Sequence, residues 1–423
     1  MSFSTEKLQT ILKPYFDKLN INTLVIAYSG GLDSTVLLHA TSSLSSCLKA
    51  DIVAVHVDHS LHENSKAWAE HCKKFCKHLG VNITVLTINV KHAKDTSPEE
   101  AARTARYKSL HSVLAENKIL LTAHHRDDQA ETVILQMLRG SGTSGLASMP
   151  ALNRSSNIYH ARPLLNFSKK ELFNYASEQK LSWITDDTNL DVDIDRNFIR
   201  REVIPIIKKR WPSFDKTLSR VARNQARADT LLHVLASKDI ESIFLHDIRN
   251  IDLRKIKELS FERQQNVIRF WVKQNNFLPP SESQVREMIR TVIASDIEKT
   301  PCIVLGNSEI RRYRNKISIM APLKQHDPQI ILTWSRGECL NIPNLDMQLA
   351  WQDLKSQCPS ILDNVEVRFR RGGESCRPRG RKQHHSLKKL MQEEGIPGWE
   401  RDRIPLVYHD EKLRLVWGYW ECL

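Results

Sequence analysis

The sequence predicts an α/β protein: a doubly wound parallel sheet in the first half, a helical middle domain and a small α+β C-terminal domain. Short apolar, β-branched runs alternate with amphipathic helical runs up to about residue 140. The first such strand leads into two adjacent glycines and then a helical run. From Phe214 to about Ile297 strand-like runs fade and long helical runs replace them.

The boundaries of the elements follow from these runs. The predicted strands of the sheet are Thr23–Tyr28, Asp51–Val57, Ile83–Ile88 and Ile119–Ala123, and the predicted helices are Thr35–Ser45, Ser65–Leu79, Ser97–Asn117 and Asp127–Leu138. Further along we expect helices over Phe214–Leu235 and Phe261–Asn275, and strands over Glu309–Tyr313, Lys316–Met320 and Ile330–Thr333. Domains are expected over residues 1–213, 214–330 and 331–423.

The turn after the first strand has the features of a phosphate site. Gly30 and Gly31 have no side chain to block a ligand. The helix that follows points its free N–H groups and its positive dipole end into the turn. Ser29 and Ser34 add hydroxyl groups. The turn is not a Walker loop, because the chain contains no Gly-Lys dipeptide.

Acidic side chains follow the fourth predicted strand. Asp128 and Glu131 are three residues apart, so both carboxylates face the same way on a helix. In a parallel sheet this helix start lies at the same edge as the glycine turn. Carboxylates in this place could hold Mg²⁺, or they could bind a cationic substrate. The alternative is that Asp127 caps the helix and the nearby acids are solvated, and the spacing alone does not favour either interpretation.

Basic and histidine side chains are expected at the same edge. Arg103 and Arg106 share a helix face and could contact phosphates; the alternative is a surface helix on which Glu99 pairs with Arg103. The second strand ends in His56, Asp58 and His59, and His124 follows the fourth strand.

The charge balance favours a polyanionic partner. The chain has 62 Lys+Arg against 49 Asp+Glu, a net charge of +13. Two segments, Arg200–Arg227 and Glu366–Leu390, each hold nine basic and two acidic residues. Two basic segments far apart in sequence suit a long nucleic acid.

Composition excludes other classes. Eight cysteines are too few for a disulfide scaffold. Cys72 and Cys76 are better explained as core residues of a helix than as metal ligands. The chain shows no signal peptide and no apolar run long enough to span a bilayer, so we expect a cytoplasmic protein without membrane contact.

The segment Ser29-Gly30-Gly31-Leu32-Asp33-Ser34 resembles the PP-loop of the ATP pyrophosphatases, which have the adenine nucleotide α hydrolase-like fold. These enzymes split ATP between the α and β phosphates. The resemblance implies that these six residues bind ATP and that Asp33 helps to hold Mg²⁺.

Further motifs occur in order along the chain and resemble the tRNA(Ile)-lysidine synthetase family. They are His56-Val57-Asp58-His59, Ala101-Ala102-Arg103 with Arg106-Tyr107, His124 to Thr132, Arg139-Gly140-Ser141-Gly142, Arg162 to Leu165, Trp183 to Asn189, Arg196 to Arg200, Arg370 to Glu374, Lys388 to Leu390, and Ile396 to Arg401. One difference is Ser60-Leu61-His62, where the family often has an arginine. A neutral histidine there would weaken a phosphate contact.

The family resemblance implies an ATP-dependent ligase acting on tRNA(Ile) with the anticodon CAU. O2 of the wobble cytidine attacks the ATP α-phosphate, and the ε-amino group of free L-lysine then displaces AMP from C2 to give lysidine. Asp128 and Glu131 would face the lysine ammonium, and Arg106 the nucleotide. His56, Arg103, His124 and Arg139 are further candidates for ATP contacts. The sequence leaves the oligomeric state open, a homodimer included.

Two rival functions remain from the residues alone. The first is another PP-loop enzyme, such as a tRNA thiolase, but the chain lacks the Cys-x-x-Cys pairs that those enzymes generally carry. The second is an RNA-binding protein that has lost its ATP site, against which the intact glycine turn argues.

Overall fold

The computed structural model describes residues 2–58, 64–88, 98–115, 117–155, 158–185, 194–296, 299–361 and 363–423. The chain forms two compact units, residues 1–232 and 233–423. The domain boundaries expected after residues 213 and 330 stay predictions. Within the described ranges, no helix has the length and apolar character needed to cross a membrane.

The first unit alternates helices and strands. Its elements are α1 (Thr5–Leu19), β1 (Thr23–Ala27), α2 (Leu32–Ser42), α3 (Ser45–Leu48), β2 (Asp51–Asp58), α4 (Ser65–His78), β3 (Asn82–Thr87), α5 (Pro98–Ser112), β4 (Lys118–Leu121), α6 (Arg126–Leu138), α7 (Thr143–Leu146), β5 (Leu152–Ser155), β6 (Ile158–Ala161), α8 (Lys169–Glu178), α9 (Asp195–Phe198), the π-helix η2 (Ile199–Val203), α10 (Ile204–Arg210) and the start of α11 (Phe214–Ile243).

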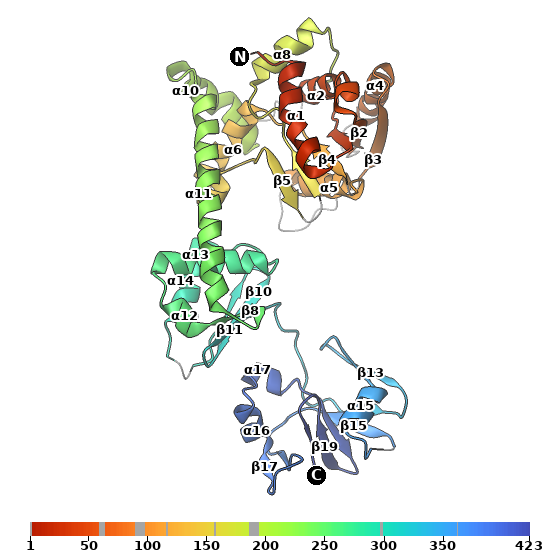
Figure 1. The fold of residues 1–423 in the computed structure, drawn as a ribbon, viewed down its shortest axis with the longest axis vertical. Helices are drawn as coiled ribbons and strands as arrows, with labels where there is room; N and C mark the ends of the chain where they lie inside the picture. The colour runs from red at the N-terminus through yellow and green to blue at the C-terminus, as the bar shows by residue number, and fades with distance from the viewer. Residues whose placement is uncertain are drawn as a thin grey trace. The chain divides into compact units, whose positions relative to one another are not determined.

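These strands form one six-stranded sheet in the order β3-β2-β1-β4-β6-β5, in which only β5 runs antiparallel to its neighbour. Successive residues of β1 face opposite sides. Leu24 and Ile26 pack with residues of α1, α2, α4 and α8, while Val25 packs with Leu110 of α5. Figure 1 shows the helices of this unit around its sheet. The doubly wound parallel sheet predicted from the sequence is therefore confirmed.

The order of the strands positions the site. The chain passes from β1 outward to β2 and β3, then returns to β4 on the other side of β1. Ligands bind at such a reversal, outside the carboxyl ends of the strands. The loops β1–α2 and β4–α6 both start there, so the glycine turn and the start of α6 lie at one edge.

Several elements of the first unit were not predicted. Helix α1 continues through Pro14, a residue that usually interrupts a helix. Strands β5 and β6 are four residues each and carry few β-branched side chains. The predicted helices and strands of the sheet agree with the structure to within a few residues at their ends.

The second unit combines helices with antiparallel sheets. Its elements are β7 (Phe244–Leu245), β8 (Asp247–Asp252), α12 (Leu253–Lys257), α13 (Phe261–Gln274), α14 (Glu282–Met288), the π-helix η3 (Ile289–Ile293), β9 (Cys302–Leu305), β10 (Ser308–Tyr313), β11 (Lys316–Met320), β12 (Leu332–Trp334), β13 (Cys339–Ile342), β14 (Met347–Ala350), α15 (Trp351–Gln357), β15 (Val365–Arg368), β16 (Ser375–Cys376), β17 (His385–Ser386), α16 (Leu387–Glu393), α17 (Gly398–Arg401), β18 (Leu406–His409), β19 (Lys412–Val416) and β20 (Trp420–Glu421).

The expected helical middle region is present as α11 to α14, and these helices pack on the sheet β7-β8-β11-β10-β9. Strand β8 lies where we expected helices only; its sequence, Asp-Ile-Arg-Asn-Ile-Asp, has too few apolar residues for a strand pattern. The last part of the chain has a second five-stranded antiparallel sheet, β12-β15-β18-β19-β20, and a disulfide between Cys376 and Cys422.

Candidate active site

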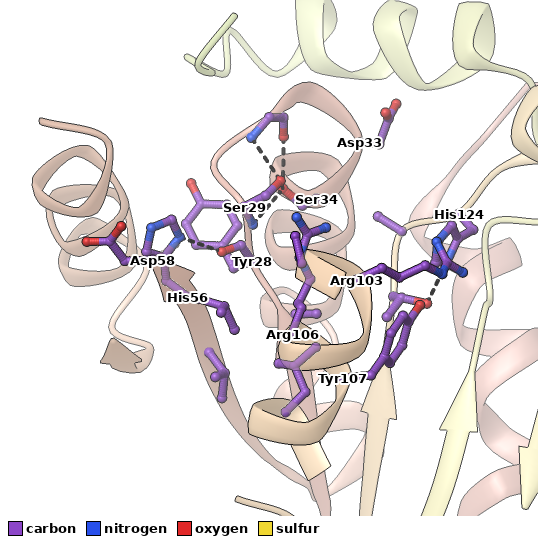
Figure 2. A pocket seen from close by; sticks show the side chains of 18 of the residues that line it. Tyr28, Ser29, Asp33, Ser34, His56, Asp58, Arg103, Arg106, Tyr107 and His124 are labelled. Atoms are coloured by element: carbon purple, nitrogen blue, oxygen red, sulfur yellow. Dashed lines mark hydrogen bonds between the residues drawn. The ribbon is translucent and has the colours of Figure 1, made fainter. Parts of the chain in front are cut away.

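A pocket of about 550 Å³ lies where the loops β1–α2 and β4–α6 meet (Figure 2). One part of its wall is apolar, and the other is polar and charged. The apolar residues are Ala27, Val55, Val57, Trp68, Ala102, Leu110 and Ala123. The polar part contains nine of the residues predicted from the sequence: Ser29, Gly31, Asp33, Ser34, His56, Arg103, Arg106, His124 and Asp128.

The glycine turn is held by its own hydroxyl groups. The Ser34 hydroxyl donates to the carbonyl oxygen of Gly31 (3.0 Å) and lies 3.0 Å from the Ser29 hydroxyl. Gly31 is the N-cap of α2, and no side chain there accepts a hydrogen bond from the first turn. The first N–H groups of α2, beginning with Leu32, are therefore available to an anion.

Gly30 and Gly31 have different structural roles. Gly30 has φ +85°, and its carbonyl oxygen accepts a hydrogen bond from the Ile184 N–H (2.9 Å). A Cβ at Gly30 would lie 2.6 Å from Cδ1 of Ile184, whereas a Cβ at Gly31 would meet only the Ser29 hydroxyl at 3.5 Å. Gly30 shapes the turn, and Gly31 faces the pocket.

Helix α6 starts with a reciprocal cap that fixes Asp128. Oδ2 of Asp128 accepts from the His125 N–H (3.0 Å), and Nδ1 of His125 accepts from the Asp128 N–H (3.3 Å). Nε2 of His125 then carries the ring proton and lies 3.4 Å from Asp128 Oδ2 and 3.5 Å from Asp33 Oδ2. One histidine thus joins two of the carboxylates that line the pocket, Asp33 and Asp128.

Two arginines bind the carboxylates of α6 from the other side. Arg196 donates from Nε to Glu131 (2.9 Å) and from Nη2 to Asp128 Oδ1 (3.2 Å). Arg200 donates to Glu131 from Nε (2.6 Å) and to Asp128 from Nη2 (3.3 Å). The sequence motif contained both arginines, but spacing alone did not show that they meet Asp128 and Glu131.

Charge decides the protonation of Asp128. Burial raises the pKa of this carboxyl, but its interactions with His125, including the hydrogen bond from the His125 N–H, and the positive charge of Arg196 together bring the pKa to about 2. Burial lowers the pKa of Arg200, but its hydrogen bond to Glu131 and the negative charges of Glu131 and Asp128 together raise it above the usual value. Asp128 is therefore an anion at neutral pH.

A buried network orients His124. The Thr122 hydroxyl lies 2.9 Å from Nδ1 of His124 and 2.8 Å from Nε2 of His160. Burial lowers the pKa of both histidines to about 3, so both rings are neutral at pH 7. Tyr107 packs against the His160 ring, with centroids 5.6 Å apart. Thr122 and His160 were not singled out from the sequence, and Tyr107 was named only as part of a motif, because nothing in their spacing relates the three residues.

Helix α5 provides the cationic wall of the pocket. The Arg103 guanidinium lies over the Tyr107 ring, 5.2 Å from its centroid. Figure 2 shows the Arg106 side chain extended toward Ser29 and Ser34. On strand β2, Nδ1 of His56 donates to the Tyr28 carbonyl oxygen (2.9 Å), which leaves Nε2 of His56 as an acceptor.

Some expected residues are not part of the pocket wall. Glu131 is 1% exposed and holds the arginines instead. Arg139 is exposed at the opposite end of α6, about 18 Å along a 13-residue helix, and its expected ATP contact stays a prediction. His59, the segment 60–62 and residues 186–189 lie outside the described residues.

The two cysteines of α4 are core residues, as predicted. Cys72 and Cys76 are fully buried, and burial raises the pKa of both thiols. Within the described residues, no group of three or more His, Cys, Asp or Glu side chains forms a metal cage.

The C-terminal basic segment is less positive than its sequence indicates. Four of its arginines pair with acids, and each of the four has an acidic partner outside the segment. Arg370 pairs with Asp402, Arg379 with Glu421, Arg381 with Glu393, and Arg368 with Glu411 as well as with Glu366 inside the segment. The exposed lysines Lys382, Lys388 and Lys389 have no acidic partner among the described residues.

Comparisons with known proteins agree with this fold. Residues 3–207 match the PP-loop domain family, residues 251–318 the TilS substrate binding domain, and residues 365–422 the TilS substrate C-terminal domain. A parallel sheet with a phosphate loop of this family defines a PP-loop enzyme that uses ATP.

Relatives extend the match to the whole chain. The tRNA(Ile)-lysidine synthase of Coxiella burnetii is 37% identical over 423 residues, which cover 99% of this chain and 93% of that protein. The enzyme of the same name from Legionella pneumophila strain Paris is 36% identical, covering 94% and 91%. The chain belongs to the tRNA(Ile)-lysidine synthase family. A solved structure, the U34-tRNA thiolase NcsA of Methanococcus maripaludis, is 17% identical with a TM-score of 0.45 and covers 52% of this chain and 77% of its own.

Proposed function

We propose that this protein joins the ε-amino group of free L-lysine to C2 of the wobble cytidine in tRNA(Ile) with the anticodon CAU. The product is lysidine, which changes the codon and amino-acid identity of the tRNA from methionine to isoleucine. The observation that carries the proposal is a complete phosphate pocket within a chain that matches tRNA(Ile)-lysidine synthases over nearly its whole length.

The reaction has two steps. O2 of the cytidine attacks the α-phosphate of ATP, and pyrophosphate leaves. The neutral ε-amine of lysine then attacks C2, the C2–O2 bond breaks, AMP leaves with that oxygen, and the amine loses a proton. Adenylation converts a poor leaving oxygen into a good one.

The two parts of the pocket suit the two parts of ATP. The apolar part, with Val55, Val57 and Leu110, suits the adenine base. The phosphates would lie against Gly31 and the start of α2, where Arg106 and Arg103 face them. The arginines and the start of α2 would stabilise the negative charge that develops at the phosphate during the reaction.

Mg²⁺ fits at Asp33. Oδ1 of Asp33 is buried and has no hydrogen-bond partner among the described residues. Mg²⁺ is usually held by one or two carboxylates together with phosphate oxygens, so a full protein cage is not required. A bound Mg²⁺ would neutralise charge on the phosphates.

Asp128 is our candidate for the lysine ammonium. It is ionised and lines the pocket, whereas Glu131 is buried behind it. We propose that Glu131 acts through Arg196 and Arg200, whose positions it fixes. A carboxylate at the ammonium also offers a route for the proton that the amine must lose.

The thiolase alternative finds no support at the pocket. Cys72 is the cysteine nearest the glycine turn, with Sγ 3.0 Å from the position of a Gly30 Cβ, but burial raises its pKa well above that of a reactive thiol. A cytoplasmic location belongs to the proposal, and the homodimer stays a prediction.

The test is incubation of the pure protein with ATP, labelled lysine and tRNA transcripts. We expect lysine incorporation only into the isoleucine transcript with the anticodon CAU, and none into the methionine transcript with the same anticodon. Equal labelling of both, or of neither, contradicts the proposal.

A further inference from the structure

Trp211 is an unusual surface residue. Its side chain is 63% exposed, while the other eight tryptophans of the chain, all within described residues, are buried or half-buried. Leaving a large apolar ring in water is unfavourable, and exposed aromatic rings are enriched where partners bind. Trp211 lies at the corner between α10 and α11.

Ion pairs hold this corner against helix α6. Lys208, three residues before Trp211, contacts Asp127 at 2.7 Å, and Asp215, four residues after it, contacts Arg126 at 2.6 Å. Arg126 and Asp127 directly precede Asp128. The corner is therefore attached, on both sides of the tryptophan, to the first turn of the helix that carries the pocket carboxylate.

Positive charge surrounds the ring. Lys209 and Arg210 are exposed immediately before Trp211. Helix α11 continues with exposed basic residues at spacings of four, three and four, which place them on one face: Lys216, Arg220, Arg223 and Arg227. None of these side chains has an acidic partner among the described residues.

We propose that Trp211 is a stacking platform for an unpaired base of the substrate RNA next to the nucleotide that is modified, with Lys209 and Arg210 contacting the neighbouring phosphates. Loop bases of RNA are recognised by stacking on aromatic side chains, and basic neighbours track the backbone. A protein partner would be a poorer match to an aromatic ring with this unpaired positive charge. The inference rests on the proposed function, because it takes RNA to be the substrate.

The test compares full-length Trp211→Ala, Trp211→Phe and Trp211→Leu, using the CAU isoleucine tRNA transcript as the probe. We expect Trp211→Ala to weaken RNA binding and raise the KM for tRNA by roughly 5- to 150-fold, with little change in the KM for ATP. Phe should retain most of the affinity. Leu, which is apolar but cannot stack, should behave like Ala.

Salt dependence separates stacking from charge. Trp211→Ala should leave the slope of log affinity against log salt unchanged. Lys209→Gln and Arg210→Gln should each flatten it, by roughly 0.7 if the phosphate lies in a single-stranded loop. Ile206→Ala, at a 72% exposed apolar position on α10, is the matched control and should bind like the unmodified protein.

Three results would overturn the inference. In the first, Trp211→Ala binds RNA as tightly as the unmodified protein. In the second, Leu replaces Trp as well as Phe does, which would indicate a general apolar contact such as a protein partner. In the third, Trp211→Ala lowers the melting temperature and raises the KM for ATP, which would indicate a structural role. If instead the unmodified protein binds this RNA but incorporates no lysine, the proposed function fails while the binding titration still tests stacking.

Discussion

The two glycines of the phosphate turn can be separated by single substitutions. At Gly31 a Cβ fits the structure, so Gly31→Val should fold but place its branched side chain where phosphate must approach. We expect loss of both AMP formation and tRNA modification, with an unchanged melting temperature. Gly30→Ala should instead destabilise the first unit, since it needs a Cβ at φ +85° against Ile184. Normal ATP turnover in Gly31→Val would show that phosphate does not bind at this turn.

Asp128→Asn tests the role of the pocket carboxylate. Asparagine keeps an oxygen that can accept the His125 N–H, so the start of α6 should persist while the negative charge is lost. We expect a rise of at least about tenfold in the KM for lysine, because a charged hydrogen bond contributes about 1.5–3 kcal/mol. Adenylation measured without lysine should change much less.

A collapse of adenylation in Asp128→Asn would assign this carboxylate to ATP or Mg²⁺ instead. Thr132→Val is a control on the same helix, because the Thr132 hydroxyl donates only to the backbone carbonyl oxygen of Asp128. Its KM for lysine should stay unchanged.

At the level of single elements, we expect the stability of the first turn of α6 to depend on pH. Burial raises the pKa of Asp127, but the hydrogen bond and positive charge of Lys208, together with the hydrogen bond from the Lys169 N–H, hold the pKa below the usual value. A carboxyl with a lowered folded-state pKa stabilises the fold above the unfolded-state pKa of about 3.9, and this contribution is lost as the pH falls through the folded-state value.

Asp127→Asn should therefore be less stable than the unmodified protein at pH 7, by up to about 1 kcal/mol for this partly exposed pair. The difference between the two proteins should shrink as the pH drops below about 4. Denaturant unfolding at pH 7 and at pH 3.5 measures both values. A difference that grows on acidification would contradict the assignment of this ion pair.

The sequence predicted helices, strands and turns well where neighbouring residues alone determine the local structure. The β-branched runs and the glycine turn determined the sheet and the phosphate loop, since strand propensity and turn chemistry act over a few residues. Strand β8 was missed because its pairing with β11, not its own composition, makes it a strand. The sequence also placed Asp128 and Glu131 on one face, but could not show that Glu131 is buried under arginines some 65 residues away along the chain.

For the whole molecule, basic segments in the sequence overstate the free positive charge of the fold. The acids that neutralise Arg370, Arg379 and Arg381 lie elsewhere in the chain and were invisible to a count over the segment. The unpaired lysines Lys382, Lys388 and Lys389 are then the residues that we expect to contact tRNA phosphates.

Replacing these three lysines by Gln should weaken tRNA binding and flatten its salt dependence, by roughly 0.7–0.9 in the log–log slope for each lost contact. The ATP site should be unaffected. Arg379→Gln, which removes a paired charge, is the matched control and should change the slope less. Identical slopes and affinities for the triple variant would leave tRNA binding to the basic segment Arg200–Arg227.

In the proposed reaction, this pocket transfers AMP to RNA before lysine reacts. The most direct measurement uses ATP labelled at the α-phosphate with the CAU isoleucine transcript and the pure protein. Without lysine, the label should become covalently attached to the RNA while pyrophosphate is released; added lysine should then discharge the label as AMP. Label that attaches to lysine instead of RNA, or that appears as AMP without any transcript, would contradict the account.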